Sequence, residues 1–119
     1  MRTLFLMLSV LLGLNACSSQ MKSPLRSNQP VINIEAVLAP SLQVSANSSQ
    51  LEIKNRADEL IKAAFLLTWY DKNGVTQRAN WQQEEQWNVL TLAAQQQKTI
   101  QLQKPNENSV NYRVYFKAN

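Results

Sequence analysis

The side chains that most often carry enzyme chemistry are scarce in this chain. It contains no histidine, and Cys17 is its one cysteine. Hydrolytic sites commonly need a nucleophile beside a base, or two acids held together in a cleft. The adjacent Glu84 and Glu85 would point to opposite faces of a strand, so a solvated loop explains them better. We therefore predict no catalytic residue and no enzyme activity.

The sequence also contains few of the side chains that bind metals or cofactors. Zinc and the softer transition metals are usually bound by imidazole and thiolate groups. The carboxylates are too scattered along the chain to suggest the closely spaced oxygen ligands of a calcium loop. The sequence predicts no metal site and no cofactor.

The charge balance bears on nucleic-acid binding. There are 12 Lys and Arg residues against 8 Asp and Glu residues, which gives a formal net charge of +4. These cations are scattered singly, whereas a nucleic-acid surface usually gathers them in a cluster or stripe. We expect no nucleic-acid partner.

The first residues have the composition of an export signal. Arg2 precedes an apolar run from Leu4 to Leu14, which is about half of the roughly 20 residues that a membrane-spanning helix needs. A short positive end and a short apolar run are typical of a secretory signal. The alternative, a buried helix of a soluble domain, would leave a helix with no polar face.

The segment Leu14-Asn15-Ala16-Cys17 resembles the lipobox of bacterial lipoproteins. The resemblance implies that residues 1–16 are a signal peptide and that the Cys17 thiol receives a diacylglyceryl group. Asn15 is a less usual middle residue, and the alternative is an ordinary signal peptide with an incidental cysteine. Because Ser18 stands where an Asp would resemble the inner-membrane retention signal, the same analogy implies a lipid-anchored protein on the periplasmic side of the outer membrane.

A polar, proline-punctuated segment separates this signal from the rest of the chain. We interpret residues 17–29 as the lipidated cysteine and a flexible tether, with a random-coil reach of roughly 20 Å. The alternative is an ordered segment laid along an edge of the domain. Residues 30–119 have the length of a single domain with one core.

Beyond Pro30, short runs rich in Val, Ile, Leu, Thr and aromatic residues alternate with polar residues and are separated by turn-forming ones. This pattern predicts strands with one buried face. About seven or eight strands in a chain of this length predict an all-β fold, an immunoglobulin-like antiparallel β-sandwich. The predicted strands cover residues 31–38, 42–46, 51–55, 60–70, 75–79, 87–92, 98–103 and 110–117.

Two of these runs carry further expectations. The run 60–70 is apolar on both faces, which predicts a central strand, although its first half has enough helical propensity to make a helix the alternative. The turn-forming residues 71–74 should fold the next strand back antiparallel. The run 31–38 lies between Pro30 and Pro40, which predicts an edge strand.

The aromatic residues offer a candidate binding surface. Trp81 lies in a polar stretch where its ring could be exposed, and Tyr70, Arg113 and Tyr115 would form an aromatic and cationic face if their strands are neighbours. Core packing and ordinary cross-strand pairing are the alternatives. Trp69 and Trp87 lie within strand patterns, so we expect both in the core.

The chain resembles the YcfL family of small proteobacterial lipoproteins. The resemblance is carried by Trp69-Tyr70-Asp71-Lys72-Asn73-Gly74, by Trp87, Leu90 and Leu92, by the strand that ends in Lys54-Asn55, and by the closing Tyr112-Arg113-Val114-Tyr115-Phe116. It implies an immunoglobulin-like sandwich with no established activity, often encoded near lipoprotein regulators of peptidoglycan synthesis.

These observations favour a non-enzymatic outer-membrane lipoprotein that acts as a periplasmic protein-interaction module of the cell envelope, with a protein partner. One alternative is a lipoprotein that tethers a secretion apparatus of the type VI kind. The other is an envelope hydrolase or inhibitor, which predicts a deep cleft with convergent polar groups.

Overall fold

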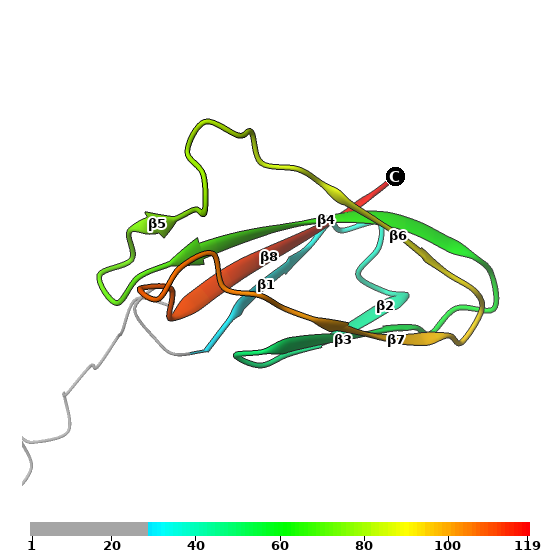
Figure 1. Ribbon diagram of the computed structural model, residues 1–119. Helices are drawn as coiled ribbons and strands as arrows, with labels where there is room; N and C mark the ends of the chain where they lie inside the picture. Colours follow the sequence, from blue (N-terminus) through cyan, green and yellow to red (C-terminus); the bar gives the residue numbers. More distant parts are fainter. Residues whose placement is uncertain (1–28) are drawn as a thin grey trace, which may run out of the picture.

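The structure, a computed structural model, describes residues 29–119, which form eight strands and no helix (Figure 1). The predicted all-β architecture is confirmed. None of the described residues forms a helix that could span a membrane. The strands are β1 (Val31–Ile34), β2 (Leu42–Ala46), β3 (Gln50–Asn55), β4 (Ile61–Tyr70), β5 (Thr76–Gln77), β6 (Asn88–Leu92), β7 (Gln97–Gln101) and β8 (Asn111–Ala118).

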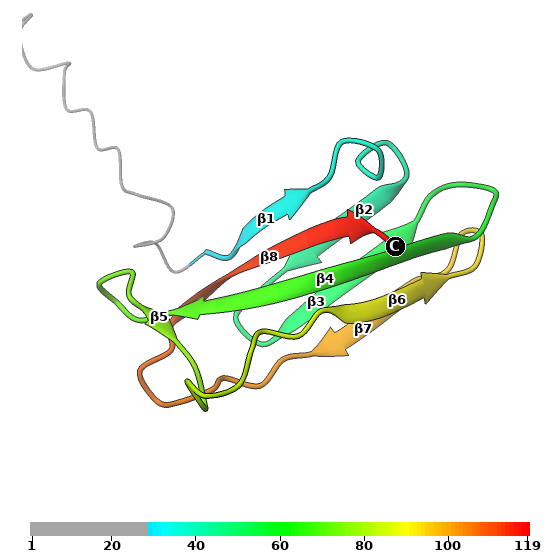
Figure 2. The same ribbon diagram turned by 90° about the horizontal axis from the view of Figure 1, so that it is seen from above.

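These strands make two sheets that face each other across one core (Figures 1 and 2). In the larger sheet, β4 lies between β8 on one side and both β5 and β6 on the other, and β1 lies outside β8. The smaller sheet has the order β2-β3-β7. The chain passes from one sheet to the other between β1 and β2, between β3 and β4, and on both sides of β7, as expected for an immunoglobulin-like sandwich.

The central strand of the larger sheet is β4, so the helical alternative for this run is wrong. It pairs antiparallel with β8 from Ala63 to Tyr70, and its first half also pairs with β6. Alternate residues such as Ala63 and Phe65 both point into the core, whereas in a helix these two side chains would lie on nearly opposite sides. Tertiary pairing therefore overrides the helical propensity of the segment.

The first strand, β1, lies at the edge of the larger sheet, as predicted, and pairs parallel with β8. It ends at Ile34, four residues before the predicted end. A turn follows, in which the N–H groups of Leu38 and Ala39 both donate to the carbonyl oxygen of Glu35, at 2.9 and 3.1 Å. This turn buries Leu38 in the core.

The core is built from the inward side chains of both sheets. Phe65 packs on Phe116 with ring centroids 5.6 Å apart, and Trp69 packs on Tyr112 at 4.9 Å. Trp69 thus lies in the core, as predicted. Burying one large apolar side chain contributes about 1.5 to 3 kcal/mol. The other buried core residues are Leu38, Leu42, Leu51, Ile53, Ile61, Ala63, Leu90, Leu92 and Val114.

One buried polar residue organises the end of the sandwich. The side-chain amide of Asn55 is fully buried and lies within bonding distance of the carbonyl oxygens of Glu59 (2.7 Å), Ala93 (3.0 Å) and Leu92 (3.2 Å). Its oxygen accepts from the N–H of Ala57 at 2.8 Å. Asn55 therefore links the β3–β4 and β6–β7 connections.

The turn after β4 forms where it was predicted. Asp71 Oδ1 accepts from the N–H groups of Asn73 (2.8 Å) and Val75 (2.9 Å), and Gly74 takes a positive φ of 81°. The following strand, β5, is only two residues long and returns antiparallel to β4. After it, the chain leaves the sheet edge and rejoins β4 only at β6.

Candidate interaction surface

The two outer faces of the sandwich differ in chemistry. On the smaller sheet, the residues that alternate with the core positions are polar, and they include one anion and one cation. They are Gln43, Ser45, Gln50, Glu52, Lys54, Gln97, Thr99 and Gln101. This is an ordinary solvated sheet surface.

The outer face of the larger sheet carries aromatic, aliphatic and cationic side chains. We call its centre the aromatic–cationic face and define it as Leu66, Trp87, Val89, Arg113, Tyr115 and Lys117. Val89 is 70% exposed, Tyr115 40% and Trp87 38%, although large apolar side chains usually lie inside. A cluster of exposed aromatic and apolar groups on a small domain commonly marks an interaction site.

The rings of Trp87 and Tyr115 contact each other across β4. Tyr115 on β8 is the register partner of Leu66, and continuing the β4–β6 register by one residue brings Trp87 beside Leu66 on the other side. The two ring centroids lie 5.8 Å apart with an interplanar angle of 75°, an edge-to-face arrangement. Lys117 Nζ lies 4.2 Å from the centre of the Trp87 ring. These contacts hold the three side chains in fixed relative positions.

The charges on this face are mainly positive. Arg113 and Lys117 alternate with Tyr115 along β8, and Lys62 lies on the same side of β4. Within residues 29–119 the ion pair that forms is Arg78–Glu85, so none of these three cations is neutralised by one. At the margin, the carboxylate of Glu35 accepts from the N–H of Ala118 at 2.9 Å.

The connection 78–87 rises beside this face, on the side of the larger sheet away from the smaller one (Figure 1). Its two ends are joined by the ion pair between Arg78 Nη2 and Glu85 Oε1, 2.9 Å apart. The Arg78 guanidinium also lies 5.3 Å from the ring centre of Trp81, which is 63% exposed. Arg78 thus organises a loop that presents an indole ring to solvent.

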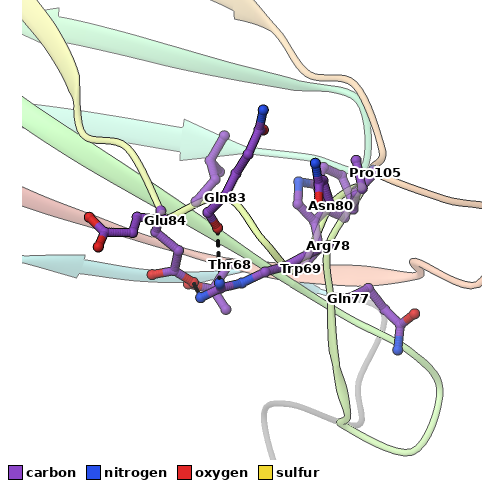
Figure 3. Close-up of a pocket in the computed structure, with 11 residues that line it drawn as sticks. Thr68, Trp69, Gln77, Arg78, Asn80, Gln83, Glu84 and Pro105 are labelled. Carbon is purple, nitrogen blue, oxygen red and sulfur yellow. Dashed lines mark hydrogen bonds and ion pairs between the residues drawn. The ribbon is translucent and has the colours of Figure 1, made fainter.

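A shallow hollow of about 190 Å³ lies between this loop and β4 (Figure 3). On this edge, β4 pairs with β6 as far as Phe65 and with β5 from Trp69 onward. The hollow forms beside the stretch of β4 between these two residues. Arg78 Nη1 donates a long hydrogen bond of 3.4 Å to the carbonyl oxygen of Gln83 there, while its Nε has no partner. Amide groups and an ion pair line the hollow, which suits recognition of a polar group.

Among the described residues, no three of the side chains His, Cys, Asp and Glu come together in a group that could hold a metal ion. The clearest change in acidity is at Tyr112, where burial raises the pKa of the phenol to about 12. Tyr112 belongs to the core and not to the exposed surface.

The structure brings two of the predicted surface residues together in the exposed face, buries a third on the same side of the sheet and places the fourth on a loop. Arg113 and Tyr115 lie two residues apart on the outer side of β8, and β4 and β8 are neighbours, as the hypothesis required. Tyr70 is on β4 but is only 8% exposed, and Trp81 lies apart on the 78–87 loop. The lipobox residues Leu14, Asn15 and Ala16 and the predicted lipidation site Cys17 lie outside the described residues.

Sequence reasoning misplaced Trp87 and missed Lys117. The expectation that Trp87 packs in the core is wrong, because its ring lies on the outer face with Lys117 above it. A signal for this was available in the alternation of the strand. Leu90 and Leu92 point inward, so Trp87, an odd number of residues from each, must point outward.

Comparison with known proteins gives a family and a fold. Residues 31–118 match a family model described as "Protein of unknown function (DUF1425)". An uncharacterized protein of Haemophilus influenzae is 39% identical over 117 residues, which cover 98% of this chain and all of that protein.

Two crystal structures are similar to this chain in fold. A DUF1425 family member from Shewanella has a TM-score of 0.52 at 22% identity, covering 66% of this chain and 74% of its own. Campylobacter jejuni Cj0090 has a TM-score of 0.58 at 20% identity, covering 76% of this chain and all of its own.

Proposed function

Because this chain belongs to the DUF1425 family of proteins of unknown function, we propose a function from its own surface. The proposed function is that of a non-enzymatic module that binds a partner protein of the cell envelope through the aromatic–cationic face. The observation that carries the proposal is the contrast between this face and the polar outer face of the smaller sheet.

The energetics of protein recognition support this assignment. Tyrosine, tryptophan and arginine are enriched among the residues that dominate binding free energy. Here Trp87, Tyr115 and Arg113 lie together on a rigid sheet, and the contacts of Trp87 with Tyr115 and Lys117 fix both aromatic rings before any partner arrives. A surface that is already ordered loses less side-chain entropy on binding.

The scarcity of catalytic groups supports a non-enzymatic role. The chain has no histidine, and its one cysteine is the residue that the lipobox-like segment would assign to lipidation. The hollow beside the 78–87 loop is shallow, and Glu85, one of its two adjacent acids, is held by Arg78. A binding surface needs none of the groups that are absent.

We further propose that the protein is a YcfL-type lipoprotein, anchored through Cys17 to the periplasmic side of the outer membrane. The support is the segment Leu14-Asn15-Ala16-Cys17 after a short apolar run. Labelling of the expressed full chain with radioactive palmitate should succeed and should be lost in Cys17→Ala. Fractionation on a sucrose gradient should place the protein with outer-membrane markers, and recovery in the inner-membrane or soluble fraction would contradict the proposed location.

The interaction itself can be tested by photo-crosslinking in living cells. A photoreactive amino acid at Tyr115 or Trp81 of the full chain should yield a discrete crosslinked product with another protein. The same amino acid at Thr99, on the outer face of the smaller sheet, is the matched control. No crosslink at Tyr115, or an equal pattern at Thr99, would overturn the proposed binding face.

A further inference from the structure

The spacing and the charge of the side chains on the aromatic–cationic face favour one class of partner. We propose that it binds an extended acidic segment of a partner protein, in which two carboxylates flank an apolar side chain at alternate positions. This inference rests on the proposed function, because it specifies the chemistry of the partner that the same face would hold.

The spacing comes from β8. Arg113, Tyr115 and Lys117 alternate along one side of the strand, in the order cation, aromatic, cation. Side chains two residues apart in a strand are separated by about 7 Å, and an extended peptide laid along β8 has the same repeat. A peptide with the alternate side chains acid, apolar and acid would therefore place each one opposite its complement.

The charge argues for an acidic partner. Arg113, Lys117 and the nearby Lys62 form no ion pair within residues 29–119, so carboxylates of a partner would meet cations that are not already neutralised. The smaller sheet offers no such excess, because Glu52 and Lys54 balance each other on its outer face. Two copies of this chain meeting face to face would oppose like charges, which disfavours self-association through this surface.

The shape argues for a narrow partner. The 78–87 loop rises beside the face and is held by the Arg78–Glu85 ion pair, with Trp81 exposed upon it (Figure 1). A planar anionic membrane would touch this loop before it reached Tyr115. A single extended polypeptide can lie on the strands alongside the loop.

The arrangement around Trp87 argues against an anionic glycan. A sugar ring stacks on an open aromatic face, but Lys117 Nζ lies 4.2 Å above the Trp87 ring and Tyr115 contacts the same ring edge to face. The Trp87 ring is thus occupied by its contacts with Lys117 and Tyr115. Lys117 and Arg113 can still donate hydrogen bonds to carboxylates.

The test uses the full chain purified in detergent and a fluorescent peptide with the core Glu-Thr-Phe-Thr-Glu, measured by anisotropy at low salt. We expect the matched peptide Gln-Thr-Phe-Thr-Gln to bind about tenfold more weakly or not at all. Arg113→Gln and Lys117→Gln should each weaken binding of the acidic peptide about two- to fivefold, and Tyr115→Ala about tenfold. Lys54→Gln, a cation removed from the other sheet, is the control and should leave binding unchanged.

Several outcomes would overturn the inference. Equal binding of the two peptides would do so, as would equal weakening by Lys54→Gln and Arg113→Gln. Unlabelled galacturonate oligomers or phosphatidylglycerol nanodiscs serve as competitors. Displacement of the peptide by either at a lower concentration than unlabelled peptide would assign the face to a glycan or a membrane.

Thermal unfolding of each variant, followed by circular dichroism, separates lost binding from lost folding. Crosslinks at Tyr115 in cells together with no preference for the acidic peptide would refute this inference alone. Absent crosslinks at Tyr115 would refute the proposed function itself.

Discussion

The phenol of Tyr112 donates a hydrogen bond of 2.6 Å to the main-chain carbonyl oxygen of Asn47, and this bond joins the two sheets. Tyr112 belongs to β8 in the larger sheet, and Asn47 directly follows β2 in the smaller one. The tyrosine is 1% exposed, so water cannot readily replace its bond to the carbonyl oxygen. Sandwich stability therefore depends partly on this polar contact as well as on the apolar core.

Replacing Tyr112 by phenylalanine should remove this bond while keeping the ring that packs on Trp69. We expect the free energy of unfolding to fall by about 1 to 2 kcal/mol, measured by urea denaturation of the full chain. Tyr115→Phe on the exposed face is the matched control and should change stability by less than about 0.5 kcal/mol. Equal effects in the two variants would show that the inter-sheet bond contributes nothing.

The acidity of Tyr112 predicts how stability depends on pH. Burial raises the pKa of its phenol to about 12 in the folded protein, whereas an unfolded chain should have a value of about 10. Between these values the unfolded state has lost the proton that the folded state keeps, so stability is fully present below about pH 10 and is lost as the pH rises toward 12.

This pH dependence can be isolated by comparison with Tyr112→Phe. Urea denaturation at several values between pH 9 and 11.5 should show a steeper loss of stability in the natural protein than in the variant. Lysine titration affects both proteins alike and cancels in the comparison. Parallel curves would mean that Tyr112 ionises as readily in the folded chain as in the unfolded one.

Asn55→Ala should be among the most destabilising substitutions of a polar residue. It would leave the N–H of Ala57 and the carbonyl oxygens at the β3–β4 and β6–β7 connections without their buried partner. We expect a loss of about 3 kcal/mol in the free energy of unfolding, measured by chemical denaturation. Asn33→Ala, at an exposed position of β1, should cost less than about 0.5 kcal/mol, and similar costs at both sites would contradict the role given to Asn55.

Gly74→Ala tests the turn that follows β4. The positive φ of 81° at this position is readily adopted by glycine but places an alanine Cβ in a strained position. We expect a loss of about 1 kcal/mol in stability by thermal or urea unfolding. Lys72→Ala in the same turn is the control, and an equal loss there would show that the backbone conformation of Gly74 is not the cause.

The three tryptophans should respond differently to a quencher in solution. Trp81 is 63% exposed and Trp69 only 7%, with Trp87 between them. Trp81→Phe should therefore lower acrylamide quenching of the total fluorescence most strongly, with little change in unfolding temperature. Trp69→Phe, the buried comparison, should leave the remaining fluorescence at least as quenchable as before. The reverse order would place Trp81 inside the fold.

The alternation of apolar and polar residues was sufficient to predict most of the sandwich. It predicted β4 as a central strand because both faces of that run are apolar, and β1 as an edge strand because prolines bracket it. It did not predict that β1 pairs parallel with β8, because partner and direction depend on contacts between residues some 80 positions apart in the chain. The end of β1 at Ile34 likewise depends on the turn that follows it, which buries Leu38 in the core.

The candidate surface was predicted only in part, for a related reason. Composition singled out the aromatic residues, and the alternation of side chains along β8 brought Arg113 and Tyr115 to one face. The inward or outward direction of Trp87 could have been obtained from the parity of Leu90 and Leu92. By contrast, the contact between Trp87 and Tyr115 depends on the joint register of β6, β4 and β8, which no local pattern specifies.

The parallel pairing of β1 with β8 also has a mechanical meaning. A force applied at Gln29 would enter the domain through β1, and a partner that bound Tyr115 under the proposed function would pull on β8. Because the two strands run in the same direction, a pull along β1 loads the hydrogen bonds of the ladder together in shear instead of opening them one at a time like a zipper. Under the proposed function, the short edge strand would therefore transmit tension between Gln29 and Tyr115.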